Sequence, residues 1–131
     1  MGYWLKLIGT VEDPVDAYSE CYVDYSARGY EYIVEGDKII LYATGRGVVF
    51  ASADVISEPR ASETQWPFRV DIQYRQEPIL VANGVHINQI ADADHDSLAQ
   101  ELQHQSFVPI SKDEFYRAET LLAVNVKSNR F

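Results

Sequence analysis

The chain has 131 residues, of which 47% are hydrophobic, and its formal net charge is −9. This length fits one ordinary domain, residues 1–131, and the apolar content excludes a disordered chain. The sequence shows neither an apolar run near the ~20 residues that span a bilayer nor a signal peptide, so we expect no membrane partner. One cysteine, Cys21, excludes an internal disulfide framework and favours a reducing, cytoplasmic location.

Four segments predict strands by their pattern of apolar residues. The first is Tyr3–Ile8, and the second, 38–43, follows a turn at 35–37. The third, 48–57, begins after a tight connection that contains two glycines. The fourth, 67–74, alternates apolar and polar residues most regularly, which is typical of a half-buried strand.

Helix signals flank these strands. Asp13 as N-cap and Pro14 at the first helical position predict a short helix that ends near Cys21 or Tyr22. Asp96 is a candidate cap for a second short helix over 97–104. Between that helix and the C-terminal region, the segment 106–110 is expected to be extended, and its proline restricts it to a sheet edge.

The last helix has the strongest local signal. Ser111 and Glu114 form a capping box, and Ile110 and Phe115 stand where a hydrophobic staple needs them. The buried stripe is expected to consist of Phe115, Ala118 and Leu122. Together these elements predict an α+β domain, with a mostly antiparallel sheet that closes into a small barrel and helices packed around it.

The sequence offers little support for a metal site or for catalysis. The acids of "DADHDS", at Asp92, Asp94 and Asp96, resemble the opening of a calcium loop. However, the sixth position is Ser97 rather than glycine, and the twelfth is Gln103 rather than glutamate. We therefore expect an acidic turn, with no cofactor, no metal and no enzymatic activity.

Tyrosines are concentrated in "YSECYVDYSARGYEY", residues 18–32, where five of fifteen residues are tyrosine. The second half of this stretch has no clean period and contains a glycine, so it is expected to be a loop or an irregular segment. Tyrosines in such a segment either plug the core or form a platform for a flat ligand. The residues by themselves favour the core plug.

Six landmarks nevertheless give the chain a family resemblance. They are "YWLKL" at 3–7, "DYSARG" at 24–29, "VEGDKIILYA" at 34–43, "FASADVISEP" at 50–59, "WPFRVDIQY" at 66–74 and "SFVPISKDEFYRAETLL" at 106–122. In this order they resemble the EVE domain, a relative of the YTH and ASCH domains in the PUA-like group. One departure is that 7–10 reads Leu-Ile-Gly-Thr where many members have Lys-Ser-Glu-Pro.

The resemblance implies a PUA-like twisted barrel of five or six strands with surrounding helices and a pocket on one side. It also implies a non-catalytic reader of a modified or flipped base, of the methylated cytosine or adenine type, in DNA or RNA. A fused or associated nuclease or restriction component is a further partner that the family suggests. Stacking on an aromatic ring and hydrogen bonds to the pairing edge are the interactions such a reader needs.

The family's site residues map onto specific positions of this chain. The base-binding pocket implied by the resemblance consists of Tyr22, Tyr25, Arg28 and Trp66, with Tyr22 as the stacking face. Within that set, Tyr25 also suits a structural role. Candidate phosphate contacts are Arg46, Arg60 and Arg69, which lie in the least acidic third of the chain.

Two rival functions remain open. One is a binding module for a free nucleoside or a similar small planar ligand, without contact to a polymer. The other is a hydrolase that uses the acids between Asp92 and Asp96 with a metal. The salt dependence of binding separates the first rival from a nucleic-acid reader, and the metal content of the protein tests the second.

Overall fold

The computed structural model describes residues 2–25, 33–62, 68–90 and 107–128. Its elements, in chain order, are β1 (Tyr3–Ile8), β2 (Tyr22–Tyr25), β3 (Lys38–Ala43), β4 (Val48–Val55), β5 (Arg60–Ala61), β6 (Phe68–Gln76), the 3-10 turn η1 (Val81–Asn83), β7 (Val85–His86), the 3-10 turn η2 (Ile87–Gln89), β8 (Phe107–Pro109) and α3 (Lys112–Ser128).

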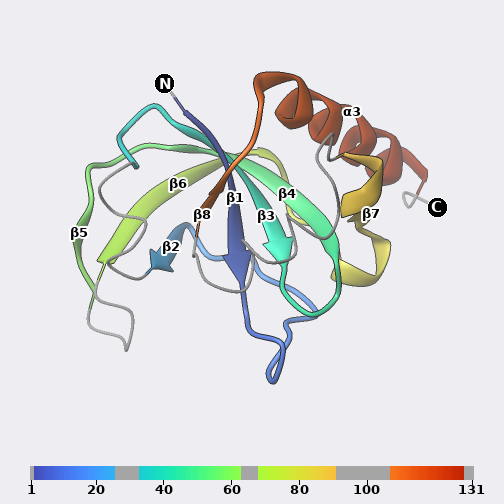
Figure 1. The fold of residues 1–131 in the computed structure, drawn as a ribbon, viewed down its shortest axis with the longest axis horizontal. Helices are drawn as coiled ribbons and strands as arrows, with labels where there is room; N and C mark the ends of the chain where they lie inside the picture. The colour runs from blue at the N-terminus through green and yellow to red at the C-terminus, as the bar shows by residue number, and fades with distance from the viewer. Residues whose placement is uncertain (1, 26–32, 63–67, 91–106, 129–131) are drawn as a thin grey trace.

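The eight strands of the described residues belong to one mixed sheet, which curls into a half-barrel (Figure 1). The main path runs β2-β6-β4-β3-β1-β8, while β5 pairs with β6 and β7 pairs with β4. β1 and β3 run parallel, and the other pairs are antiparallel. The predicted mostly antiparallel, curled sheet with a C-terminal helix is therefore confirmed. The described strands form a half-barrel rather than the closed barrel that was expected, a single α-helix of the described residues packs on it, and the parallel pair was not anticipated.

The predicted strands are confirmed as β1, β3, β4 and β6, and the extended segment is confirmed as β8 at one edge of the sheet. The turns between them depend on glycine. Gly36 has a φ of 97°, and Gly45 and Gly47 have φ values of 84° and 74°, in the left-handed region that side chains disfavour. These residues reverse the chain before β3 and between β3 and β4.

The helix predicted from Asp13 is wrong, because no helix occurs among the described residues 9–21. The Asp13 backbone N–H instead donates to the Thr10 hydroxyl at 2.9 Å, and the Asp13 carbonyl accepts from Thr10 N at 3.2 Å. Further along, the Val81 N–H donates to the Asp16 carbonyl at 3.0 Å. The segment therefore forms a turn and then runs beside the barrel. The helix predicted over 97–104 lies outside the described residues.

The core has two parts. One lies between the sheet and α3, where Phe115, Ala118 and Leu122 are buried as predicted. The capping box is also confirmed: Glu114 N donates to Ser111 Oγ at 3.0 Å, and Ser111 N donates to Glu114 Oε1 at 2.9 Å. α3 crosses the end of the sheet beside β7 (Figure 1).

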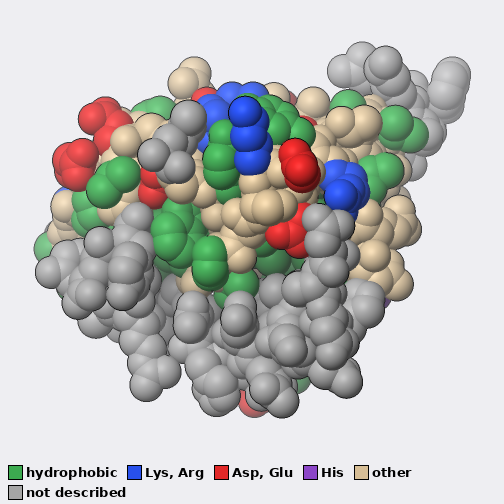
Figure 2. Space-filling model, turned by 45° about the horizontal axis from the view of Figure 1, so that its top comes forward, with side chains coloured by type: hydrophobic (Ala, Val, Ile, Leu, Met, Phe, Trp, Pro, Cys, Tyr) green, Lys and Arg blue, Asp and Glu red, His purple; other side chains and the backbone are tan. Residues whose placement is uncertain are grey.

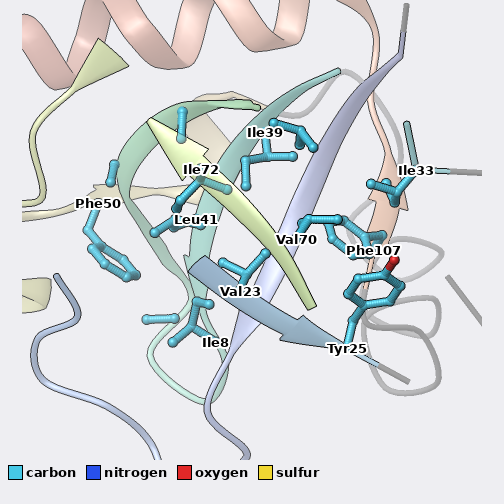
Figure 3. Close-up of a cluster of buried hydrophobic side chains, with 14 of the residues drawn as sticks. Ile8, Val23, Tyr25, Ile33, Ile39, Leu41, Phe50, Val70, Ile72 and Phe107 are labelled. Atoms are coloured by element: carbon cyan, nitrogen blue, oxygen red, sulfur yellow. The ribbon is translucent and has the colours of Figure 1, made fainter. Parts of the chain in front are cut away.

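The second part of the core fills the inside of the curled sheet (Figure 3). Tyr25 from β2 and Phe107 from β8 point toward one another there, with ring centroids 5.1 Å apart. β2 and β8 are the two ends of the strand path. The ring contact therefore joins the two ends of the sheet.

Candidate functional site

β2 places the tyrosines of the sequence motif on opposite faces of the sheet. Val23 and Tyr25 are fully buried in the core, whereas Tyr22 and Asp24 on the other face are only partly buried. This alternation is the ordinary period of a strand. Two expectations are corrected. Tyr25 belongs to a strand rather than to an irregular segment. It also lies on the opposite face from Tyr22, so the two do not share a pocket, because the Tyr25 ring packs against Phe107 and Phe68.

Tyr22 carries an arginine on its ring. The guanidinium carbon of Arg69, on β6, lies 3.8 Å from the centroid of the Tyr22 ring. Such a short distance is a cation–π contact, in which the guanidinium lies over one face of the ring. The sequence suggested Arg69 as a phosphate contact, but the structure makes it a neighbour of the proposed stacking residue.

Asp24, which lies directly opposite Arg69 in the register of β2 and β6, fixes this arginine. Arg69 Nε donates to Asp24 Oδ1 at 2.6 Å, and Arg69 Nη2 donates to Asp24 Oδ2 at 3.1 Å. These bonds raise the pKa of Arg69 further above its usual value. A bidentate pair of this kind is among the stronger polar contacts in proteins. Tyr22, Arg69 and Asp24 therefore form one unit, called here the Tyr22–Arg69 stack.

Arg60 lies next to the stack. In the register of β5 and β6 it stands directly opposite Arg69, and its Nη2 atom lies 2.5 Å from Asp71 Oδ1. Both side chains of this pair are well exposed, at 48% and 39%. The third predicted phosphate contact, Arg46, is in the turn between β3 and β4, and its Nη2 atom lies 3.1 Å from Asp16 Oδ1.

Each of the three candidate arginines thus has an aspartate partner. Basic and acidic side chains also lie close together on the surface. On the face shown in Figure 2, Lys and Arg side chains gather near the upper edge, with Asp and Glu side chains close by. Local neutralisation of this kind weakens any broad positive field. It agrees with the net charge of −9, which does not favour nonspecific attraction of a polyanion.

Several predicted site residues lie outside the described part of the chain. They are Arg28 and Trp66 of the implied base pocket, and the acids Asp92, Asp94 and Asp96. Among the described residues, no group of three or more His, Cys, Asp or Glu side chains is arranged to hold a metal. Within the same part of the chain, no helix has both the length and the apolar character needed to cross a bilayer.

Two further tyrosines position the segment that leads into β2. The Tyr18 hydroxyl donates to the Tyr22 carbonyl at 2.5 Å, and the Tyr74 hydroxyl donates to the Glu20 carbonyl at 2.6 Å. Burial raises the pKa of both phenols, so they stay protonated and remain donors. These two bonds hold the backbone at Glu20 and at Tyr22, the residue whose ring contacts Arg69.

Lys6 is a second unusual polar group, which the sequence did not single out. It is only 4% exposed, and burial lowers its pKa from 10.5 to about 7, against the opposing field of Asp24. Its ammonium donates to the Leu7 carbonyl at 2.6 Å and lies 5.4 Å from the centroid of the Phe107 ring. No carboxylate of the described residues forms an ion pair with it.

Asp24 is the site residue that sequence reasoning missed. The pattern contained a usable signal, because both "YVDY" and "FRVDIQY" alternate apolar and polar residues. A register that pairs Val23 with Val70 necessarily places Asp24 opposite Arg69. What the sequence did not supply is that these two strands are neighbours.

Comparison with known proteins identifies structures with a similar fold but no protein of known activity. No protein-family profile matches the chain, and no curated protein matches it. The NMR structure of Rpa0253 from Rhodopseudomonas palustris is similar, with a TM-score of 0.59 and 13% identity over 95% of this chain and 94% of that one. The crystal structure of Atu2648 from Agrobacterium tumefaciens has a TM-score of 0.54 and 14% identity, over 92% of each chain.

A hypothetical protein from Leishmania major is also similar, with a TM-score of 0.55 and 15% identity over 99% of this chain and 98% of that one. At these identities the likeness concerns the fold alone. Because nearly the whole length of each chain is covered, the curled sheet with its C-terminal helix is shared as a complete architecture.

Proposed function

We propose that this protein is a non-catalytic, PUA-like domain of the EVE type that binds nucleic acid by recognising a modified or flipped base. The observation that carries the proposal is the Tyr22–Arg69 stack. A guanidinium held on a tyrosine ring adds a second flat group to the ring, and bases stack on both aromatic rings and arginine guanidinium groups. Arg60, opposite Arg69 in register, supplies a cation for the adjoining phosphate.

The rigidity of the stack supports this proposal. Asp24 holds Arg69 through two hydrogen bonds, and Tyr18 and Tyr74 hold the backbone on the N-terminal side of Asp24. A platform that is ordered before binding loses less conformational entropy when a ligand arrives. The six sequence landmarks of the EVE domain and the curled sheet with one C-terminal helix agree with the same assignment.

The experiment that tests the proposal is a binding panel of short DNA and RNA oligonucleotides that carry methylated or hydroxymethylated bases, each beside its unmodified counterpart. The wild-type protein is expected to prefer one modification. Tyr22→Ala should weaken binding of the preferred oligonucleotide by about 1–3 kcal/mol, the value of one stacked base. Tyr22→Phe keeps the ring and should lose less.

Arg69→Ala separates a stacking role from a simple phosphate contact. If Arg69 extends the Tyr22 surface, its removal should reduce the preference for the modified base as well as the overall affinity. If it only contacts phosphate, modified and unmodified strands should weaken alike. Equal binding of all oligonucleotides by the wild-type protein would exclude base recognition.

The acidic surface favours one alternative, a binding module for a free nucleoside or a similar small planar ligand. Salt distinguishes the two functions, because binding of a polymer weakens steeply as counterions are added whereas binding of a neutral nucleoside barely changes. Titrating the preferred nucleoside and the corresponding oligonucleotide at low and high salt decides between them.

A further inference from the structure

The three arginines suggested as phosphate contacts all hold carboxylates in the free protein. The partners are Asp16 for Arg46, Asp71 for Arg60 and Asp24 for Arg69. A carboxylate and a phosphate use the same guanidinium N–H groups. Any phosphate that approaches these arginines must therefore displace a carboxylate or bind to donors that the carboxylate leaves free.

The Arg69–Asp24 pair within the stack and the Arg60–Asp71 pair beside it differ in how firmly they are held. Arg69 and Asp24 share two hydrogen bonds, and their side chains are only 20% and 13% exposed. Arg60 and Asp71 share one hydrogen bond at the surface. Exposed single-contact pairs contribute little to stability, so a phosphate displaces Asp71 more readily than Asp24.

Because Arg60 lies beside Arg69, the loss of its carboxylate partner changes the charge next to the stack. Arg60 stands opposite Arg69 across β5 and β6, so two like charges face one another in register. Unpaired, they would form a compact cationic site on an otherwise acidic protein. In the free protein Asp71 neutralises Arg60, and Asp24 neutralises Arg69.

We propose that Asp71 is a specificity-determining residue, which occupies Arg60 in the free protein and so prevents binding to a nucleic-acid backbone that offers no recognised base. This inference rests on the proposed function. In this proposal a phosphate takes the place of Asp71 on Arg60, so one anion replaces another and the contact adds little net affinity. Net affinity then comes from the base on the Tyr22–Arg69 stack.

The test compares Asp71→Asn with Asp113→Asn, a variant that makes the same change in charge. Asp113 is exposed in the first turn of α3, and α3 and β5 lie at opposite sides of the molecule in Figure 1. The probe is a short unmodified single-stranded oligonucleotide at fixed low salt. Asp71→Asn should bind it about tenfold more tightly, with a steeper salt dependence by about one phosphate contact. Asp113→Asn should change binding by less than about twofold, the small effect of a distant charge that salt screens.

Two further variants secure the interpretation. Arg60→Gln in the Asp71→Asn background should return the affinity to the wild-type value, because the gain requires the released guanidinium. Asp71→Ser removes the carboxylate in a different way and replaces Asp71→Asn if that variant fails to fold. Equal affinities of the Asp71 and Asp113 variants for the unmodified strand would overturn the inference.

The experiment distinguishes a failure of this inference from a failure of the proposed function. If the wild-type protein prefers a modified base but Asp71→Asn gains no affinity for the unmodified strand, only the role of Asp71 fails. If no modification is preferred while Asp71→Asn still gains affinity through Arg60, base recognition fails and the blocking of Arg60 by Asp71 stands.

Discussion

Tyr25 and Phe107 lie with their ring centroids 5.1 Å apart and their planes at 77°, and they connect the first and last strands of the sheet path. Tyr25 is fully buried, and Phe107 is 2% exposed. On its other side, Tyr25 stacks on Phe68 of β6 with a centroid distance of 5.7 Å. Tyr25, which the resemblance placed in the base pocket and which also suited a structural role, is therefore an anchor of the sheet interior.

We expect Tyr25→Ala to lower the free energy of unfolding by about 3–5 kcal/mol, as for other large aromatic side chains removed from a core. Urea denaturation measures this loss. Tyr22→Ala serves as the control and should cost much less, since that ring is only partly buried. A double-mutant cycle with Tyr25→Leu and Phe107→Leu should give a coupling of about 0.5–1.5 kcal/mol. Additive losses would mean that the ring contact contributes no specific energy.

The predictable parts of the fold are those that depend on residues close together in the sequence. The alternation in β6 and the spacing of Ser111 and Glu114 involve neighbours in sequence, and both predictions were confirmed. Asp13 and Pro14 also gave a local helix signal. There, however, Thr10 and the distant Val81 use the backbone groups of the segment, so the tertiary contacts decided against a helix.

The candidate site shows the same limit. The resemblance pointed to Tyr22, and the structure leaves it on the partly exposed face of β2. The same reasoning placed Tyr25 beside it, because strand alternation was not expected in this stretch. Asp24 and Arg69 are 45 residues apart, and only the pairing of β2 with β6 brings them together. Such register is set by the whole sheet and has no local signature.

The capping box of α3 gives a second prediction. Ser111→Ala removes the oxygen that accepts from Glu114 N, and we expect a loss of about 0.5–2 kcal/mol in the free energy of unfolding. Ser111→Asp keeps a capping oxygen and places a negative charge at the helix N-terminus, so it should retain wild-type stability. Thermal and urea unfolding of both variants provide the comparison. A loss of equal size in both would show that the cap is not the cause.

Asp37 provides a third prediction, because its buried carboxylate accepts hydrogen bonds from three donors. It accepts from Gly2 N at 2.7 Å, from Trp4 Nε1 at 3.1 Å and from Val34 N at 3.1 Å, and the residue is only 1% exposed. Asp37→Ala removes the acceptor that these three donors share, at an expected cost of about 1–3 kcal/mol. Asp37→Asn keeps one acceptor oxygen and should cost less. Tryptophan fluorescence would follow unfolding, and equal stabilities of the alanine variant and the wild type would rule out this role.

The last prediction concerns Lys6, whose burial couples stability to pH. In the folded protein its pKa is about 7, whereas in the unfolded chain it returns to its ordinary value near 10.5. Between these two values the unfolded chain binds more protons, so the free energy of unfolding rises with pH. The contribution of Lys6 is at most about 1.4 kcal/mol per pH unit. Below pH 7 both states are protonated, and the full cost of the buried charge is present.

Lys6→Met keeps an unbranched side chain, one heavy atom shorter, and removes the charge. We expect this variant to be more stable than the wild type near pH 7, and to lose the rise in stability up to about pH 9.5. Lys112→Met, at an exposed position in α3, is the matched control and should keep the wild-type slope. Above about pH 10 the raised pKa values of Tyr18 and Tyr74 act in the opposite direction, because the unfolded chain then loses phenolic protons first. Urea unfolding across this range measures the slopes, and an unchanged slope in Lys6→Met would show that Lys6 keeps its proton in the folded core.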